Sequence, residues 1–114
     1  MLGDGTQQKA YLHVSDLVDA MWFVASLPLQ RRTVLNIGPA DDGVTVRWIA
    51  EQVCARVSPA ARIVLGRGNK GWVGDVPRFR YATDKLSALG WRPRLDSQAA
   101  IVRAIDEIAT QEGA

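Results

Sequence analysis

Short aliphatic runs alternate along this sequence with segments of helical periodicity, and this alternation constrains the fold more than any other feature. Three runs rich in aliphatic residues predict strands, at Lys9–Val14, Thr33–Gly38 and Ile63–Leu65. Segments with apolar residues three and four positions apart follow the first two runs and recur near the C-terminus, which predicts helices. Alternating strands and helices indicate an α/β fold. We expect a small sheet of about three short strands with three to four helices.

The expected helices are bounded by residues that suit helix ends. Four starts are predicted at side chains able to accept backbone N–H bonds: Ser15 or Asp16, Thr45, Thr83, and Asp96 or Ser97. Gly90 suits the left-handed residue that ends the short third helix. Six apolar residues after Thr45 share one helix face and predict a buried stripe: Val46, Ile49, Ala50, Val53, Cys54 and Val57. In the last helix Ile101, Ala104, Ile105 and Ile108 are expected to face inward.

Size and composition predict a single domain over residues 1–114 in a reducing compartment. The 114 residues suffice for one core and contain no low-complexity tract. No apolar run approaches the roughly 18 residues that span a bilayer, and the first residues do not resemble a signal peptide. Cys54 is the single cysteine, so no intramolecular disulfide forms, and core packing is its expected role. We therefore expect a cytoplasmic protein with no membrane partner and no metal site.

Positive charge is concentrated in the middle of the chain. Residues 56–94 carry nine Lys or Arg against two acids, a net +7, whereas the flanking segments are −2 and −3. One interpretation is a solvated basic face; the other is a site for an anion such as a phosphate or diphosphate. A nucleic-acid partner is not expected, because no recognition motif or stacking aromatic pattern accompanies the charge. Residues 66–81 are expected to form an irregular basic loop.

Two motifs in this region match known cofactor and catalytic patterns without their structural context. Gly66 to Gly71 reads G-x-G-x-x-G, which binds a dinucleotide only where a helix begins directly after the glycines. Gly74 and Pro77 prevent such a helix here. Tyr81 and Lys85 form Y-x-x-x-K, but Tyr81 is expected to precede the short helix, so the two would not share a face. Neither motif is therefore expected to function in cofactor binding or catalysis.

Three segments in order resemble the C-terminal part of the nucleotide-sugar epimerase/dehydratase family. They are "GDGTQQKAYLHVSDLVDA", "TVLNIGPADDGVTVRWIAEQV" and "GWVGDVPRFRYATDKLSALGWRPRLDSQAAI". The first is similar to the family's G-x-G-x-x-R-D-Y-x-H-V-x-D-L-x-x-A, and the third to its G-D…K…L-G-W-x-P tail. Members are extended short-chain dehydrogenases that use NAD, with UDP-glucose 4-epimerase as the type member.

The resemblance implies a substrate-binding portion without the chemistry. The family's Gly-rich NAD loop, catalytic Ser or Thr and catalytic Y-x-x-x-K have no counterpart in this sequence. We therefore expect nucleotide-sugar binding, no catalytic residue, no NAD bound by this chain alone, and no activity of the chain alone. The alternative is a non-catalytic binding or oligomerisation module that has lost the enzyme chemistry.

The resemblance also implies which residues touch the ligand. They are Lys9, Tyr11, Lys70, Trp72, Asp75 and Phe79. Lys9 and Trp72 stand where the family has diphosphate-binding arginines, and Lys70 is a substitute for the second. Lysine keeps the charge at position 9 but loses the two-pronged guanidinium. Asp75 matches a residue near the ribose, and Tyr11 and Phe79 match pocket aromatics; surface or core roles are the alternatives for the aromatic residues. His13 is expected to satisfy a local hydrogen bond and Asp16 to cap a helix.

The last expectation concerns association. In the family the strand matching Thr33–Ile37 pairs with strands of the NAD-binding domain. Without them it has a free edge and uncovered apolar side chains, and Trp22 and Phe23 lie off the main helix stripe. We expect a homodimer or an assembly with an NAD-binding half. The alternative is a compact monomer with a self-contained sheet.

Overall fold

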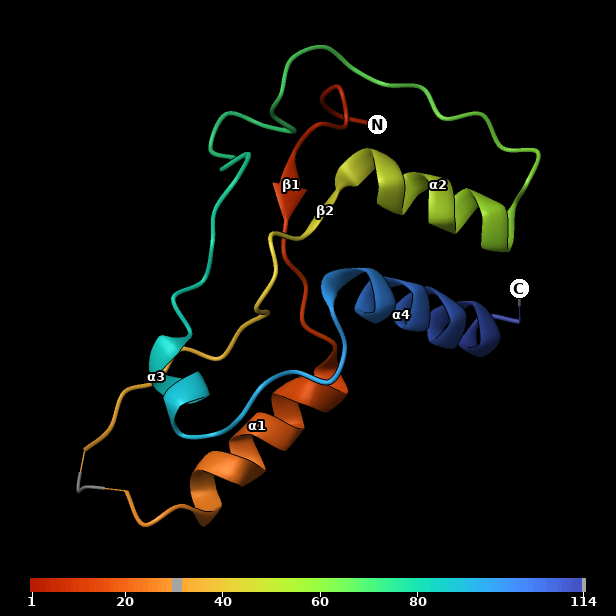
Figure 1. Ribbon diagram of the computed structural model, residues 1–114. Helices are drawn as coiled ribbons and strands as arrows, with labels where there is room; N and C mark the ends of the chain where they lie inside the picture. Colours follow the sequence, from red (N-terminus) through yellow and green to blue (C-terminus); the bar gives the residue numbers. More distant parts are fainter. Residues whose placement is uncertain (30–31, 114) are drawn as a thin grey trace.

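A computed structural model describes residues 1–29 and 32–113. The elements, in chain order, are β1 (Gln8–Lys9), α1 (Val14–Ser26), β2 (Val44–Thr45), α2 (Val46–Val57), α3 (Asp84–Ala88) and α4 (Ser97–Gln111). Figure 1 shows α2 and α4 side by side at one end of the molecule, and α1 with α3 at the other. The two short strands lie between these groups, and a long irregular segment after α2 returns across the molecule to α3. This is a small α/β protein, as the alternating sequence pattern predicts.

The described sheet is smaller than expected. β1 and β2 pair antiparallel, with Gln8 opposite Thr45 and Lys9 opposite Val44. The predicted strand at Lys9–Val14 is wrong beyond its first residue, since the chain leaves the sheet at Ala10 and α1 begins at Val14. The predicted strands at Thr33–Gly38 and Ile63–Leu65 are also wrong, because both segments are irregular. A strand is held by its neighbour's backbone groups, and the described chain provides no ladder for either segment.

Most of the helix ends follow the side-chain chemistry. Thr45 accepts a hydrogen bond from the Trp48 N–H at 3.2 Å, Asp96 accepts one from the Ala99 N–H at 2.8 Å, and Gly90 has φ +100°. Thr83 stands at the start of α3 but makes no side-chain cap bond. The expected cap at Ser15 or Asp16 is wrong. The imidazole of His13 accepts from the Ser15 N–H instead, which confirms the local role expected for His13.

The core lies between α1, α3 and the segment that joins α3 to α4. Ala20, Leu86 and Trp91 form its buried centre, and five partly buried residues pack around them: Leu12, Phe23, Val24, Leu35 and Ile37. Phe23 therefore belongs to the core, contrary to the expectation that it lies uncovered beside Trp22. Trp22 itself is 75% exposed, as expected.

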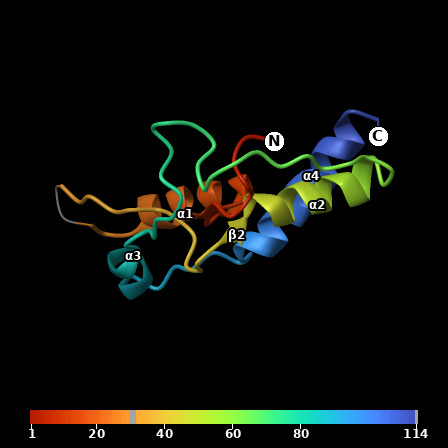
Figure 2. The same cartoon turned by 90° about the horizontal axis from the view of Figure 1, so that it is seen from above.

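The second packing unit is the pair of helices α2 and α4, which are in contact and cross each other in the view of Figure 2. Their predicted inward stripes are only partly covered. Val46, Ile49, Ala50 and Cys54 are half-buried, but Val53 and Val57 are exposed. In α4 the prediction for Ile108 is wrong, since its side chain is exposed and Ala100 and Ala109 are buried instead. The apolar stripes of α2 and α4 are therefore wider than the contact between the two helices, and part of each stripe stays exposed.

The whole chain is flat and open. Its extents are 52 × 34 × 18 Å and its radius of gyration is 16.7 Å, compared with about 13 Å for a compact domain of this length. The accessible surface is 8046 Å², whereas a compact monomer of 12.5 kDa exposes about 6,200 Å². No helix within residues 1–29 and 32–113 has the length and apolar character needed to cross a membrane.

Candidate functional site

An ion pair between β1 and the loop after residue 66 is the centre of the candidate site. The Lys9 ammonium donates to the Asp75 carboxylate at 2.7 Å, and the Gly71 N–H donates to the same carboxylate at 3.1 Å. The hydrogen bond from Lys9, with that from Gly71, lowers the pKa of the Asp75 carboxyl. The same bond to Asp75 raises the pKa of Lys9. Both groups are therefore held charged, and the pair attaches the basic loop to the sheet.

A cavity of about 380 Å³ lies beside this pair, and we call it the Lys9 cavity. Its walls come from residues 9–12, α1, residues 37–39, and two aromatic rings near the end of the loop. Those rings, Phe79 and Tyr81, meet edge to face with centroids 5.2 Å apart. Tyr11 lines the same cavity, and burial raises the pKa of its phenol. Three aromatic side chains and one ammonium therefore border a space of the size that small-molecule ligands occupy.

Hydrogen bonds to the start of α4 fix the backbone of the Lys9 cavity. The Tyr11 N–H donates to the Ser97 hydroxyl at 2.8 Å, and that hydroxyl donates to Asp41 at 2.6 Å. The Ser97 N–H also donates to Asp41, at 2.8 Å. Ser97 is buried, so this network holds Tyr11 in place through fully paired polar groups.

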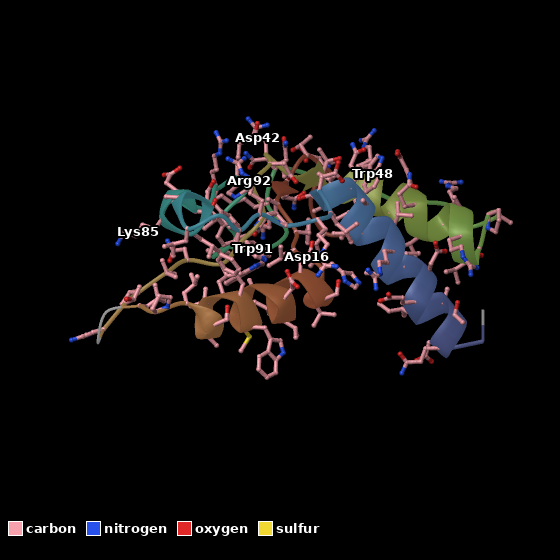
Figure 3. All side chains as sticks on the ribbon, turned by 60° about the horizontal axis from the view of Figure 1, so that its bottom comes forward. Asp16, Asp42, Trp48, Lys85, Trp91 and Arg92 are labelled. Atoms are coloured by element: carbon pink, nitrogen blue, oxygen red, sulfur yellow. The ribbon has the colours of Figure 1, made fainter. Side chains whose placement is uncertain are left out.

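A second buried carboxylate fastens the C-terminal segment to α1. Asp16 accepts hydrogen bonds from the Arg94 and Leu95 N–H groups, both at 3.1 Å. Asp19, one turn on, accepts from the Trp91 indole at 3.0 Å and from the Arg94 guanidinium at 2.7 Å. Figure 3 shows Asp16 and Trp91 facing each other across the space between α1 and this segment. Asp16 is therefore a tertiary anchor rather than the cap that the sequence predicted.

The structure brings four of the six predicted ligand residues together and leaves two apart. Lys9, Tyr11 and Phe79 line the Lys9 cavity, and Asp75 is bonded to Lys9. Lys70 is exposed on the loop, and Trp72 is 68% exposed with its ring over Gly74. Neither lines the Lys9 cavity.

The Gly-rich motif does not have the structure of a dinucleotide-binding loop. After Gly66–Gly71 the chain stays irregular, and the next helix is α3, which begins at Asp84. No helix N-terminus therefore follows the glycines to hold a diphosphate, as expected from the breakers in the sequence. Tyr81 lies before α3, so it does not share a helix face with Lys85. Within the described part of the chain, no group of three His, Cys, Asp or Glu side chains could hold a metal ion.

A larger cavity of about 540 Å³ lies on the other side of Tyr81, and the sequence did not reveal it. We call it the arginine cavity, because Arg80 and Arg92 both line it, together with residues of α3. Both arginines belong to the basic segment 56–94, but their spacing along the chain gives no indication that they line one cavity. In the sequence, the only sign of this cavity is the excess of positive charge over residues 56–94.

Two comparisons with known proteins lead to the same family. A family model described as the NAD dependent epimerase/dehydratase family matches residues 1–38. The chain is also 32% identical over 111 residues to GDP-L-fucose synthase 1 from Arabidopsis thaliana, an alignment that covers 91% of this chain and 31% of the relative. The chain thus spans about a third of the length of the curated relative it matches. Both similarities support the NAD-dependent epimerase/dehydratase family, which is a family of nucleotide-sugar enzymes.

Proposed function

We propose that this chain is the nucleotide-sugar-binding, C-terminal portion of an NAD-dependent epimerase/dehydratase. The observation that carries the proposal is the Lys9 cavity, where the ion pair of Lys9 and Asp75 stands beside the aromatic rings of Tyr11 and Phe79. Aromatic walls suit a sugar or base, and a fixed ammonium suits an anionic group. Lys70 and Trp72 are proposed to approach the same ligand from the loop. The family similarity supports the class of ligand.

In this proposal the chain binds but does not catalyse by itself. Its Gly-rich loop and its Tyr81–Lys85 motif lack the geometry for NAD binding and proton transfer. The chemistry would come from an NAD-binding portion, corresponding to the part of the relative that this chain does not match.

We further propose that the NAD-binding portion covers the outer face of α1. Four large apolar side chains on that face are exposed: Val14, Val18, Met21 and Trp22. Leu17 is also exposed but lines the Lys9 cavity instead. The two carboxylates of α1 instead face inward, because Asp16 is buried and Asp19 bonds Trp91. A helix that directs its carboxylates to partners within the chain and exposes its apolar residues is typical of an interface. The excess surface of about 1,800 Å² over a compact monomer is more than the roughly 800 Å² that one partner buries in a standard protein interface.

Titration of the isolated chain with GDP-L-fucose or UDP-glucose at low salt, followed by NMR, tests the binding function. We expect dissociation constants from millimolar to high micromolar, about −4 to −6 kcal/mol. The shifts should centre on Tyr11 and Phe79 and weaken with salt. Lys9→Met should weaken binding, whereas Lys85→Met is the matched control, because Lys85 lines neither cavity and its side chain extends outward from the molecule in Figure 3. Shifts absent from Tyr11 and Phe79 would refute the proposal.

A further inference from the structure

His13 is the single histidine of the chain, and it joins the start of α1 to α4. Its side chain is 4% exposed, and its Nε2 atom lies 3.1 Å from the carboxylate of Glu107, which is 94 positions away along the chain. Figure 1 shows that α1 begins at its end nearest α4. Histidine is the one side-chain type that ordinarily changes charge between pH 5 and 8. A proton gained or lost by His13 therefore acts directly at the junction of two helices.

The hydrogen bonds of His13 fix which ring nitrogen carries the proton. The Ser15 N–H donates to Nδ1 at 3.2 Å. A backbone N–H can only donate, so Nδ1 has no proton while this bond exists, and the proton of the neutral ring is on Nε2. Nε2–H then donates to the Glu107 carboxylate. The neutral ring in this tautomer therefore serves two neighbours at once, as the cap of α1 and as a donor to α4.

The charged groups around His13 come from α4 and from the first turn of α1. Glu107 also accepts a hydrogen bond from Arg103 at 2.7 Å, and the bonds from Arg103 and His13 lower the pKa of Glu107. In α1, Asp16 is buried and accepts two backbone N–H groups of the segment before α4. The two carboxylates attract a positive charge on the ring, whereas Arg103 and the N-terminal end of α1 repel it. These charges together set the pH at which the ring gains a proton, and the hydrogen bonds decide what that proton breaks.

A second proton on the ring changes one of its bonds and keeps the other. The proton binds Nδ1, the free nitrogen, and removes the acceptor of the Ser15 N–H. The Ser15 hydroxyl lies 2.8 Å from Nδ1 and can accept the new N–H, but the backbone N–H of Ser15 loses its partner. Nε2–H keeps its bond to Glu107, which becomes an ion pair. Protonation thus removes the side-chain cap of α1 and strengthens the contact with α4.

We propose that His13 is a pH-sensitive switch: its neutral ring caps α1, and its protonated ring releases the first turn of α1 while remaining bonded to α4. That turn follows residues 9–12 and includes Leu17, and these residues line the Lys9 cavity. Acid therefore loosens one wall of the cavity. The inference concerns the start of α1 and does not depend on which ligand the cavity binds.

NMR of the full chain tests both parts of this proposal. Imidazole nitrogen spectra at about pH 8 should show the proton on Nε2. Amide hydrogen exchange is then compared at about pH 8 and pH 5 as protection factors, which correct for the intrinsic pH dependence of exchange. The protection factor of the Ser15 amide should fall about fivefold in acid, which corresponds to the loss of one helix cap. The Trp48 amide is the internal control and should not change, because its acceptor is the Thr45 hydroxyl, which does not titrate.

Three substitutions separate capping from charge. His13→Asn keeps a side-chain acceptor at the cap and has no titratable group, so Ser15 should stay protected at both pH values. Glu107→Gln keeps an acceptor for Nε2–H without the negative charge, so the loss of protection should move to lower pH. Glu51→Gln, at an exposed carboxylate of α2, is the matched control and should leave the transition where it is.

The switch is overturned by a proton on Nδ1 at about pH 8, by a Ser15 protection factor that stays constant down to about pH 5, or by an equal fall in His13→Asn. If His13→Asn does not fold, the nitrogen spectra and the exchange of the unaltered chain still decide between the two outcomes. Failure of the switch would leave the proposed nucleotide-sugar binding standing, since that is judged by ligand-induced shifts at Tyr11 and Phe79.

Discussion

Asp75 links the basic loop to β1 through charge, so its protonation should loosen that link. Its pKa is lowered in the folded chain by the Lys9 and Gly71 hydrogen bonds. Its contribution to stability is therefore full above the ordinary aspartate pKa of about 3.9 and is lost as the pH falls through the lowered value. We expect Asp75→Asn to lower the midpoint of thermal unfolding at pH 7, by an amount that shrinks steadily in acid. Asp42→Asn, at an exposed carboxylate, is the control. A difference that stays constant down to strong acid would contradict this role.

Asp16 illustrates a single residue that holds two distant segments. Its buried carboxylate accepts the Arg94 and Leu95 N–H groups, and removal would leave both donors without that partner. Asp16→Ala should therefore lower the free energy of unfolding by about 2–4 kcal/mol, measured by urea denaturation at pH 7. Asp16→Asn keeps one acceptor oxygen and should cost less. An unchanged free energy of unfolding in the alanine variant would refute the anchor.

At the scale of elements, α1 is the helix whose exposed side chains belong against another surface. Replacing Met21 and Trp22 together by Gln should leave the free energy of unfolding of the isolated chain within about 0.5 kcal/mol, since both side chains are exposed. The same change should reduce binding of a hydrophobic dye and self-association, both measured at micromolar concentration. Val102→Gln, in α4, also replaces an exposed apolar residue but lies on another face and is the control. A marked loss of stability would show that these side chains are already packed.

The elements also differ in how far the sequence predicted them. Thr45 and Asp96 cap helices where expected, because a cap depends on residues three positions away. The strand predictions at Thr33–Gly38 and Ile63–Leu65 were wrong, because strand pairing depends on a neighbour that the local sequence does not specify. The residues of the candidate site also differ in whether the sequence predicted them. Family resemblance indicated Lys9, Tyr11 and Phe79, but that Arg80 and Arg92 line one cavity depends on the tertiary path of the chain.

At the scale of the whole molecule, the chain is flat, with extents of 52 × 34 × 18 Å, and exposes about 1,800 Å² more surface than a compact monomer of its mass. We therefore expect the chain to associate, either with itself or with an NAD-binding portion supplied in trans. Sedimentation at micromolar concentration should show a species larger than 12.5 kDa, or a complex when that portion is added. A monomer of that mass, with slowly exchanging amides at Val34–Ile37, would instead indicate a self-contained fold.

The bond between Tyr11 and Ser97 joins residues 86 positions apart, and that between Lys9 and Asp75 joins residues 66 apart. During synthesis, therefore, the first wall of the Lys9 cavity leaves the ribosome long before the residues that hold it in place. Until Ser97 emerges, Tyr11 has no partner for its N–H, and α1 lacks the segment that its two carboxylates bind. Closure of such long loops is slow. A nascent chain stalled before residue 97 should thus be open to proteases around Tyr11, and protection should appear abruptly once α4 begins to emerge.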